Sequence, residues 1–189
     1  MRVYFSGAIY QKEKFLNSYK RIVGTLEKEE YEVFEDTTKV SLEEAVNKTD
    51  EQRVDYYKRV LKWIDKCDLV VIEASFPSTL SIGHEIAISL EKGKSVVIMY
   101  QEGFEPAFLL GLKHEKVEWV KYNPNNLEGV LASALKKVKK NIDVRFNFFV
   151  SPKILAYLDW VAEKRMIPRS VFLRNLIEKE IRKDKGFRQ

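Results

Sequence analysis

The segment DLVVIEASFPSTLSIGHE, from Asp68 to Glu85, decides the fold that we expect for this chain. Its apolar run Leu69–Ile72 predicts a buried strand of a parallel sheet, and the Pro, Ser and Thr residues that follow predict a loop. Apolar residues then recur at helical spacing until Gly93, which is typical of an amphipathic helix that ends at a glycine. Such a strand, loop and helix N-terminus form an anion-binding arrangement, because free N–H groups and the helix dipole favour negative charge. We expect Glu85 near the first turn of that helix, at the mouth of a crevice.

The rest of the first 143 residues repeats this alternation of short apolar runs and amphipathic segments. The pattern predicts an α/β domain with a doubly wound parallel sheet of about five strands. The expected strands are residues 3–5, 31–34, 69–72, 95–99 and 117–120. Ligands bind outside the carboxyl ends of such strands, so we expect Ser6–Gly7 and the loop around Ser78 to face one crevice. The polar residues 35–49 predict a long loop that has room for one helical turn, and a loop of that length over a crevice is often functional.

One predicted helix lies between that loop and the central strand. Either Thr49 or Asp50 is a suitable N-cap for it. We expect its apolar face, which would pack on the sheet, to contain four residues. These are Val54, Tyr57, Leu61 and Ile64.

Composition restricts the classes of protein to which the chain can belong. Of its 189 residues, 45% are apolar and 32% are charged, which is typical of a globular protein. No apolar run is long enough to cross a bilayer and no signal peptide is visible, so we expect no membrane partner. The single cysteine, Cys67, excludes an intrachain disulfide and favours a cytoplasmic location. With two histidines and one cysteine, we expect no metal site of the usual zinc kind and no cofactor.

The last 45 residues differ from the others in charge and in pattern. Residues 145–189 contain 11 Lys and Arg against 5 Asp and Glu, whereas the residues before them are nearly neutral. This asymmetry points to a separate module with a polyanionic partner. Arg145–Val150 partly alternates as a strand does, Ser151–Pro152 is a favourable start for one helix, and Ser170 is expected to cap a second helix. We therefore expect two domains, residues 1–143 and residues 144–189.

The order of one strand and two helices in this tail resembles a ribbon-helix-helix module. Modules of that family pair the strands of two chains into a ribbon that enters the major groove of DNA. The resemblance implies a homodimer, or a higher even oligomer, that binds double-stranded DNA. It places Arg145, Asn147 and Phe149 at the bases, and Arg169 and Ser170 at a phosphate. The residues by themselves also allow a dimerisation or docking arm with a solvated basic face.

Three segments of the N-terminal part carry a second resemblance. They are Val3–Ile9, Trp63–Glu73 and Pro77–Glu85. In this order they resemble the nucleoside 2-deoxyribosyltransferase family, and most closely its 2′-deoxynucleoside 5′-phosphate N-hydrolase branch. The resemblance implies a flavodoxin-like sheet, a nucleoside or nucleotide ligand, and cleavage of the bond between the base and deoxyribose.

The same resemblance implies roles for individual residues. Glu85 matches the glutamate that attacks or stabilises the anomeric carbon, where an oxocarbenium-like sugar requires a carboxylate. The residues that match the nucleoside-contacting first loop are Tyr4, Ser6, Gly7 and Ile9. The residues that match or neighbour the phosphate-binding loop are Ser78, Thr79, Ser81 and Gly83.

The sequence departs from this family at the second acid, which would protonate the leaving base. The family has an aspartate three residues before the position of Trp63, and this chain has Val60 there. The main hypothesis is therefore a ligand-responsive transcriptional regulator, with a nucleotide-binding head and a DNA-binding tail. The alternative is an active N-glycosidase or deoxyribosyltransferase that uses Glu85, with a tail for oligomerisation. A third option is an NAD-type glycohydrolase.

Overall fold

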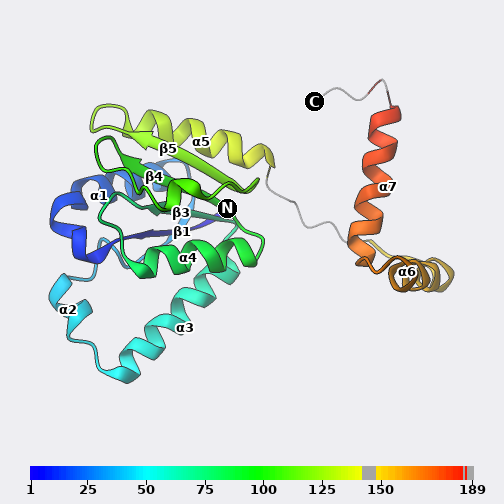
Figure 1. Cartoon of the computed structure of the whole chain (residues 1–189), viewed down its shortest axis with the longest axis horizontal. Helices are drawn as coiled ribbons and strands as arrows, with labels where there is room; N and C mark the ends of the chain where they lie inside the picture. The colour runs from blue at the N-terminus through cyan, green and yellow to red at the C-terminus, as the bar shows by residue number, and fades with distance from the viewer. Residues whose placement is uncertain (142–147, 185, 187–189) are drawn as a thin grey trace. The chain divides into compact units, whose positions relative to one another are not determined.

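The computed structural model describes residues 1–141, 148–184 and 186, and the chain divides into two compact units, Met1–Asp143 and Val144–Gln189 (Figure 1). The first unit contains one parallel sheet with the strand order β2-β1-β3-β4-β5. Its strands are β1 (Arg2–Gly7), β2 (Glu32–Phe34), β3 (Leu69–Glu73), β4 (Ser95–Gln101) and β5 (Val117–Tyr122). The predicted α/β class and the flavodoxin-like, doubly wound sheet of five strands are confirmed.

Helices cover both faces of this sheet (Figure 1). One face packs against α1 (Lys12–Lys28) and α5 (Leu127–Asn141), and the other against α3 (Asp50–Lys66) and α4 (Leu80–Glu91). Three short elements lie in the connections: η1 (Ile9–Gln11), α2 (Leu42–Val46) and η2 (Leu109–Gly111). Among the described residues, no helix has both the length and the apolar character that a membrane span requires.

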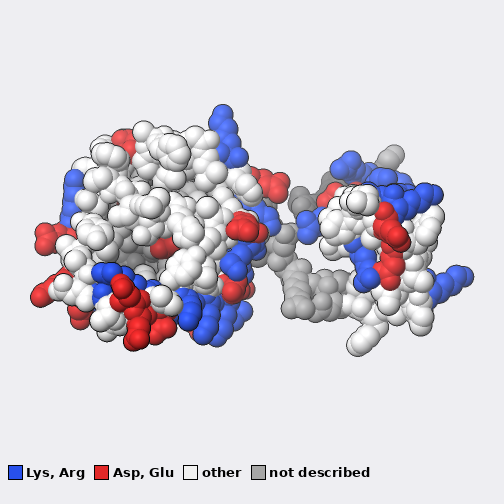
Figure 2. Space-filling view, turned by 60° about the horizontal axis from the view of Figure 1, so that its bottom comes forward, with Lys and Arg blue, Asp and Glu red and all other residues white. Residues whose placement is uncertain are grey.

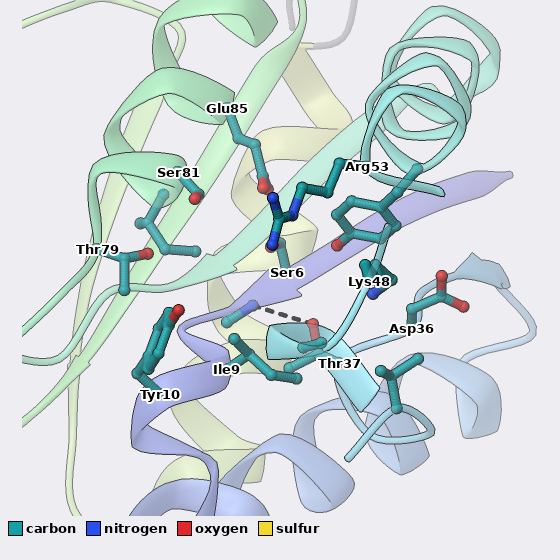
Figure 3. A pocket seen from close by; sticks show the side chains of 15 residues that line it. Ser6, Ile9, Tyr10, Asp36, Thr37, Lys48, Arg53, Thr79, Ser81 and Glu85 are labelled. Atoms are coloured by element: carbon teal, nitrogen blue, oxygen red, sulfur yellow. Dashed lines mark hydrogen bonds between the residues drawn. The ribbon is translucent and has the colours of Figure 1, made fainter. Parts of the chain in front are cut away.

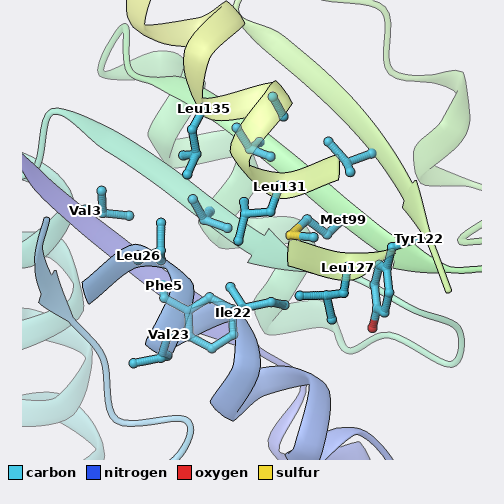
Figure 4. Close-up of a cluster of buried hydrophobic side chains, with 14 of the residues drawn as sticks. Val3, Phe5, Ile22, Val23, Leu26, Met99, Tyr122, Leu127, Leu131 and Leu135 are labelled. Carbon is cyan, nitrogen blue, oxygen red and sulfur yellow. The ribbon is translucent and has the colours of Figure 1, made fainter. Parts of the chain in front are cut away.

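The alternation of side chains along each strand assigns residues to the two faces. Val3 and Phe5 of β1 are buried in the cluster with α1 and α5 (Figure 4), whereas Tyr4 between them is buried with α3 and α4. β3 alternates in the same way. Its last residue, Glu73, therefore lies on the α1 and α5 side, while Ser6 at the end of β1 lies on the α3 and α4 side.

The start of α4 differs from the sequence-based expectation. The helix begins directly after its N-cap, Thr79, so Glu85 lies in its second turn rather than its first. Gly83 likewise belongs to the helix and not to the loop. The helix begins early because Ile82 and Ile86, one turn apart, are both buried against the sheet, so that the apolar face extends further towards the N-terminus than predicted.

The predicted apolar face of α3 is wrong in its first half. Thr49, one of the two predicted N-caps, caps the helix. Val54 and Tyr57, which were expected on the apolar face, are 51% and 46% exposed. The buried residues of α3 are Val60 and Ile64. The first turns of α3 extend beyond the sheet (Figure 1), so only its later turns have apolar partners there.

The second unit contains two helices, α6 (Pro152–Arg165) and α7 (Arg169–Lys183). Ser151 caps α6 as predicted, and its hydroxyl accepts a hydrogen bond from the backbone N–H of Ile154. The predicted cap at Ser170 is wrong, because α7 begins after Pro168 and Ser170 is its second residue. Met166 ends α6 in the left-handed conformation and Pro168 is extended, so α7 begins at Arg169, one residue before Ser170.

The predicted strand Arg145–Val150 is tested only in part. Arg145 and Asn147 lie outside the described residues, and residues 148–150 do not form a strand. A strand needs a neighbouring strand to accept and donate its backbone hydrogen bonds, and no described strand pairs with this segment.

Candidate active site

A cavity of about 240 Å³ opens at the carboxyl ends of β1 and β2, beside the start of α4 (Figure 3). In the strand order β2-β1-β3-β4-β5, the direction in which successive strands are added changes at β1. Ligands of doubly wound sheets usually bind at such a point. The face of the unit is largely uncharged at its centre, where it is hollowed, and most charged side chains lie nearer the rim (Figure 2). The lining residues are Ser6, Gly7, Ile9, Tyr10, Asp36, Thr37, Val40, Ala45, Lys48, Arg53, Tyr56, Thr79, Ser81, Ile82 and Glu85.

Glu85 is the acidic group at the inner wall of this cavity. It is only 8% exposed, and its carboxylate points from α4 into the space above Ser6 (Figure 3). The Tyr4 hydroxyl donates a hydrogen bond to Glu85 Oε2 at 3.0 Å, and the Ser6 side chain lies near this carboxylate in the same cavity. Burial raises the pKa of Glu85, while the polar side chains of Ser6 and Tyr4 act in the opposite direction. The Tyr4 hydroxyl on β1 therefore orients the carboxylate.

The N-terminus of α4 forms one wall of the cavity. Thr79 and Ser81 lie together there (Figure 3), and the Thr79 side chain makes no capping hydrogen bond. The first backbone N–H groups of a helix have no partner inside the helix, and the dipole adds partial positive charge at this end. Hydroxyl and amide donors at this wall are suited to bind an anion such as a phosphate.

The opposite wall comes from the segment after β2 and from the start of α3. Thr37 Oγ1 accepts a hydrogen bond from the backbone N–H of Gly7 at 3.3 Å, which ties this segment to β1 (Figure 3). Lys48 Nζ lies 4.6 Å from the centre of the Tyr56 ring. Asp36 pairs with Arg59 of α3, which does not line the cavity. Positively and negatively charged side chains therefore both lie near Tyr56.

Gly7 is required at the end of β1 because another ring lies close to it. A Cβ atom at this position would lie 2.9 Å from the Tyr19 ring. Tyr19 is fully buried and its hydroxyl donates a hydrogen bond to the carbonyl oxygen of Ala8. The turn that leads from β1 into the cavity is therefore fixed by packing on the far side of the sheet.

The structure brings most of the sequence-predicted ligand residues together. Six of them line the cavity: Ser6, Gly7, Ile9, Thr79, Ser81 and Glu85. Tyr4 lies behind the wall and reaches the site through its hydrogen bond to Glu85. Ser78 and Gly83 do not line the cavity, because Ser78 precedes the helix cap and Gly83 lies on another side of α4. Their functional roles remain predictions.

Several other residues line the cavity that the sequence analysis did not name as ligand residues. These are Tyr10 of η1, Asp36, Thr37 and Lys48 of the opposite wall, and Arg53 and Tyr56 of α3. The signal for the opposite wall was the polar loop 35–49, which was expected above the crevice but without named residues. From the sequence, Tyr56 is expected in the core or the crevice wall, and Arg53 could reach a phosphate although surface arginines of a helix are usually solvated.

Val60 occupies an apolar position on α3. It is 4% exposed, belongs to the cluster of α3 and α4, and borders a second hollow that also adjoins Glu85. A valine side chain cannot donate a proton, so this position supplies no acid to the cavity. Among the described residues, no cluster of His, Cys, Asp and Glu is suited to hold a metal ion.

The proposed DNA-contacting residues of the tail lie on the surface where they are described. Phe149 is fully exposed, and Arg169 pairs with Asp159. Arg145 and Asn147 lie outside the described residues, as noted above.

Comparison with known proteins supports the fold of the first unit. No family model and no curated protein matches the chain by sequence. Among solved structures, the chain is similar to the CMP N-glycosidase BcmB of Clostridium botulinum, with 20% identity and a TM-score of 0.51. The similarity covers 72% of this chain and 99% of that chain. At this identity the similarity establishes a shared fold, and the chemistry has to be argued from the site.

Proposed function

We propose that the N-terminal unit hydrolyses the N-glycosidic bond of a nucleoside 5′-monophosphate, with Glu85 as the nucleophile. One observation carries this proposal. Glu85 is a buried residue that lines the cavity, accepts a hydrogen bond from Tyr4 of β1, and shares the cavity with the N-terminus of α4. A carboxylate and an anion-binding helix start within one cavity suit the two ends of a sugar phosphate.

Each part of the cavity has a defined role in this reaction. The 5′-phosphate binds at Thr79, Ser81 and the first N–H groups of α4. The sugar then lies over Ser6, with its anomeric carbon towards Glu85. A carboxylate stabilises the positive charge that develops on the sugar as the base departs, or traps it as a covalent ester that water hydrolyses. The hydrogen bond from Tyr4 orients this carboxylate and lowers its pKa against the effect of burial.

The fold comparison favours the enzyme over the regulator for this unit. The similar structure is that of a CMP N-glycosidase, and the similarity spans 99% of that chain. Together with the placement of Glu85, this supports the alternative reading of the sequence, an active N-glycosidase. Whether the sugar is ribose or deoxyribose is part of the test.

The direct test is base release. The full chain is incubated with cytidine 5′-monophosphate and with a panel of other ribo- and deoxyribonucleoside 5′-monophosphates, and free base is quantified by chromatography. We expect release from at least one substrate, loss of release in Glu85→Gln, and unchanged release in Glu91→Gln, an exposed carboxylate on the same helix. Release that persists in Glu85→Gln would contradict the proposed role of Glu85.

For the second unit we propose self-association and binding of double-stranded DNA. Its buried apolar core consists of Leu158, Val161 and Phe172 among the described residues, which is too small for a stable domain of 46 residues. Exposed apolar side chains on both helices favour a second copy as the partner, in a homodimer or a higher even oligomer. They are Ile154, Leu155, Tyr157, Trp160, Val171, Leu176, Ile177 and Ile181.

The charge excess of this unit supports a polyanionic ligand. The full chain and residues 1–143 are compared by light scattering and by duplex-DNA titration at several salt concentrations. We expect the full chain, but not residues 1–143, to form dimers. We also expect only the full chain to bind DNA, with an affinity that falls as the salt concentration rises. A monomeric full chain, or DNA binding that does not depend on salt, would refute this proposal.

A further inference from the structure

The proposed hydrolysis needs a proton for the departing base, and the cavity offers no free carboxyl group for it. Among the described lining residues, the acids are Glu85 and Asp36. In the proposed reaction Glu85 acts as the nucleophile at the anomeric carbon, so it cannot also protonate the base. Asp36 Oδ2 lies 2.5 Å from Arg59 Nη2, so this carboxylate is engaged in an ion pair. The position at which the resembled family carries an aspartate is Val60.

Tyr56 lies one helical turn before Val60 on α3 and therefore on the same face of that helix. It borders both the cavity and the second hollow beside Glu85. In the described part of the chain, its hydroxyl makes no hydrogen bond. Its neighbours differ in this respect, because the Tyr4 hydroxyl donates to Glu85 and the Tyr57 hydroxyl lies 3.1 Å from His84 Nε2.

Charged side chains of both signs surround Tyr56, and in the resting site its phenol is protonated. The cations are Lys48, with Nζ 4.6 Å from the ring centre, and Arg59, with its guanidinium 5.5 Å away. The anions are Glu85 from α4 and Asp36 from the segment after β2. Burial first, and then these two carboxylates, raise the pKa of Tyr56 to about 12, so the phenol is protonated at neutral pH.

We propose that Tyr56 is the catalytic proton donor to the leaving base, in place of the carboxyl group that Val60 cannot supply. This inference rests on the proposed N-glycosidase function. In the first step a Glu85 oxygen bonds to C1′, the C1′–N bond breaks with its electron pair on the base, and the Tyr56 proton passes to the base. In the second step water bonds to C1′, Glu85 leaves as carboxylate, and the proton of water passes to the Tyr56 phenolate.

The position of Tyr56 beside Glu85 couples the two steps. The negative charge of Glu85 disfavours the phenolate, and this charge disappears when Glu85 forms the ester. Tyr56 thus becomes a stronger acid at the moment when the base needs its proton. When water restores the Glu85 carboxylate, Tyr56 again becomes the stronger base and takes the proton. Lys48 and Arg59 stabilise the phenolate between these events.

The test compares two leaving groups on the same sugar phosphate. One substrate is the nucleoside 5′-monophosphate with the highest turnover in the panel, and the other is the matching 4-nitrophenyl glycoside 5-phosphate, whose phenolate leaves without protonation. For Tyr56→Phe we expect kcat on the nucleotide to fall about 100-fold or more, and kcat on the nitrophenyl substrate to change by less than about threefold. Tyr57→Phe, the adjacent exposed tyrosine, is the matched control and should change neither rate.

The outcomes separate the two proposals. Glu85→Gln should abolish turnover of both substrates, and retention of both would overturn the proposed function and this inference with it. If Glu85→Gln is inactive and Tyr56→Phe loses both substrates equally, or neither, the role of Tyr56 as proton donor is refuted while the function stands. No turnover of any substrate by the wild-type chain would overturn both proposals.

Discussion

The two faces of the sheet each bury one glutamate, and the pair shows what distinguishes a site from a structural network. Glu85 on the α3 and α4 side accepts a hydrogen bond from Tyr4, and Glu73 on the α1 and α5 side accepts hydrogen bonds from Tyr122 and Ser75. Both carboxyl groups have a raised pKa because both are buried. Of the two, only Glu85 lines a cavity in the described part of the chain. Burial and a tyrosine donor are therefore common to both, and the contact with a cavity distinguishes Glu85.

Glu73 has a structural role in a hydrogen-bond network at the carboxyl ends of three strands. The Tyr122 hydroxyl donates to Glu73 Oε1 at 2.9 Å, and the Ser75 hydroxyl donates to the same oxygen. Ser75 Oγ in turn accepts a hydrogen bond from the backbone N–H of Gln101 at 2.8 Å. This network connects β3, β4 and β5 at their carboxyl ends and fixes the beginning of the loop that leads to Thr79.

The largest expected difference between the two glutamates is in catalysis. Glu85→Gln should lower kcat/KM for base release by about 10³-fold or more, because the amide cannot stabilise the developing positive charge. Glu73→Gln should retain activity within about threefold at neutral pH. Both are measured by chromatographic base release from the best nucleotide of the panel. Equal losses of activity in the two variants would contradict the assignment of the catalytic role to Glu85.

The second difference is in the pH dependence of stability. Burial raises the pKa of Glu73 to about 7, so the folded chain holds this proton more tightly than the unfolded chain does. Stabilisation by the neutral carboxyl group is complete below about pH 4.5 and is lost as the pH rises to about 7, by at most about 3 kcal/mol. Urea titrations at pH 5 and pH 8 should show this fall in the free energy of unfolding.

Glu73→Gln provides the check on that assignment. The variant keeps an oxygen acceptor for Tyr122 and Ser75 but has no proton to lose, so its free energy of unfolding should change less between pH 5 and pH 8 than that of the wild type. An identical fall in both proteins would assign the titration to another group.

A third prediction concerns the tyrosines that hold the two carboxylates. Tyr4→Phe removes a hydrogen bond that lowers the pKa of Glu85, so this pKa should rise and the acidic limb of the kcat/KM profile should move to higher pH. At neutral pH the activity should fall about tenfold, which corresponds to about 1.4 kcal/mol. Tyr122→Phe should leave the acidic limb in place. A loss of activity in Tyr4→Phe without a shift of this limb would contradict the proposed role.

The smallest expected effect is at the phosphate wall. Ser81→Ala should raise KM for a nucleoside 5′-monophosphate about fivefold, near the value of about 1 kcal/mol for one hydrogen bond among several. The kcat/KM for the nucleoside without phosphate should be unchanged. Ser133→Ala, an exposed serine on α5, is the matched control. An equal effect on both substrates would place the phosphate elsewhere.

Much of the site could be predicted from local sequence because two segments supply the residues that were named, the end of β1 and the stretch from β3 to α4. The apolar run of β3, the loop after it and the glutamate on α4 are all within 18 residues, and the carboxyl ends of parallel strands meet at one edge of the sheet. The positions of Lys48 and Tyr56 beside the cavity could not be predicted in the same way. Lys48 lies in the segment after β2 and Tyr56 on α3, and only the tertiary path of these elements brings them to the cavity.

The sequence by itself determined the α/β class, the parallel sheet and the edge of the sheet at which the cavity opens, because strand and helix periodicity are local properties of the chain. Only the tertiary structure decided which buried glutamate opens to a cavity, that α3 extends beyond the sheet, and that Tyr56 stands beside Glu85 where Val60 supplies no acid. Each of these depends on contacts between segments distant in sequence, and burial and electrostatic coupling arise from such contacts.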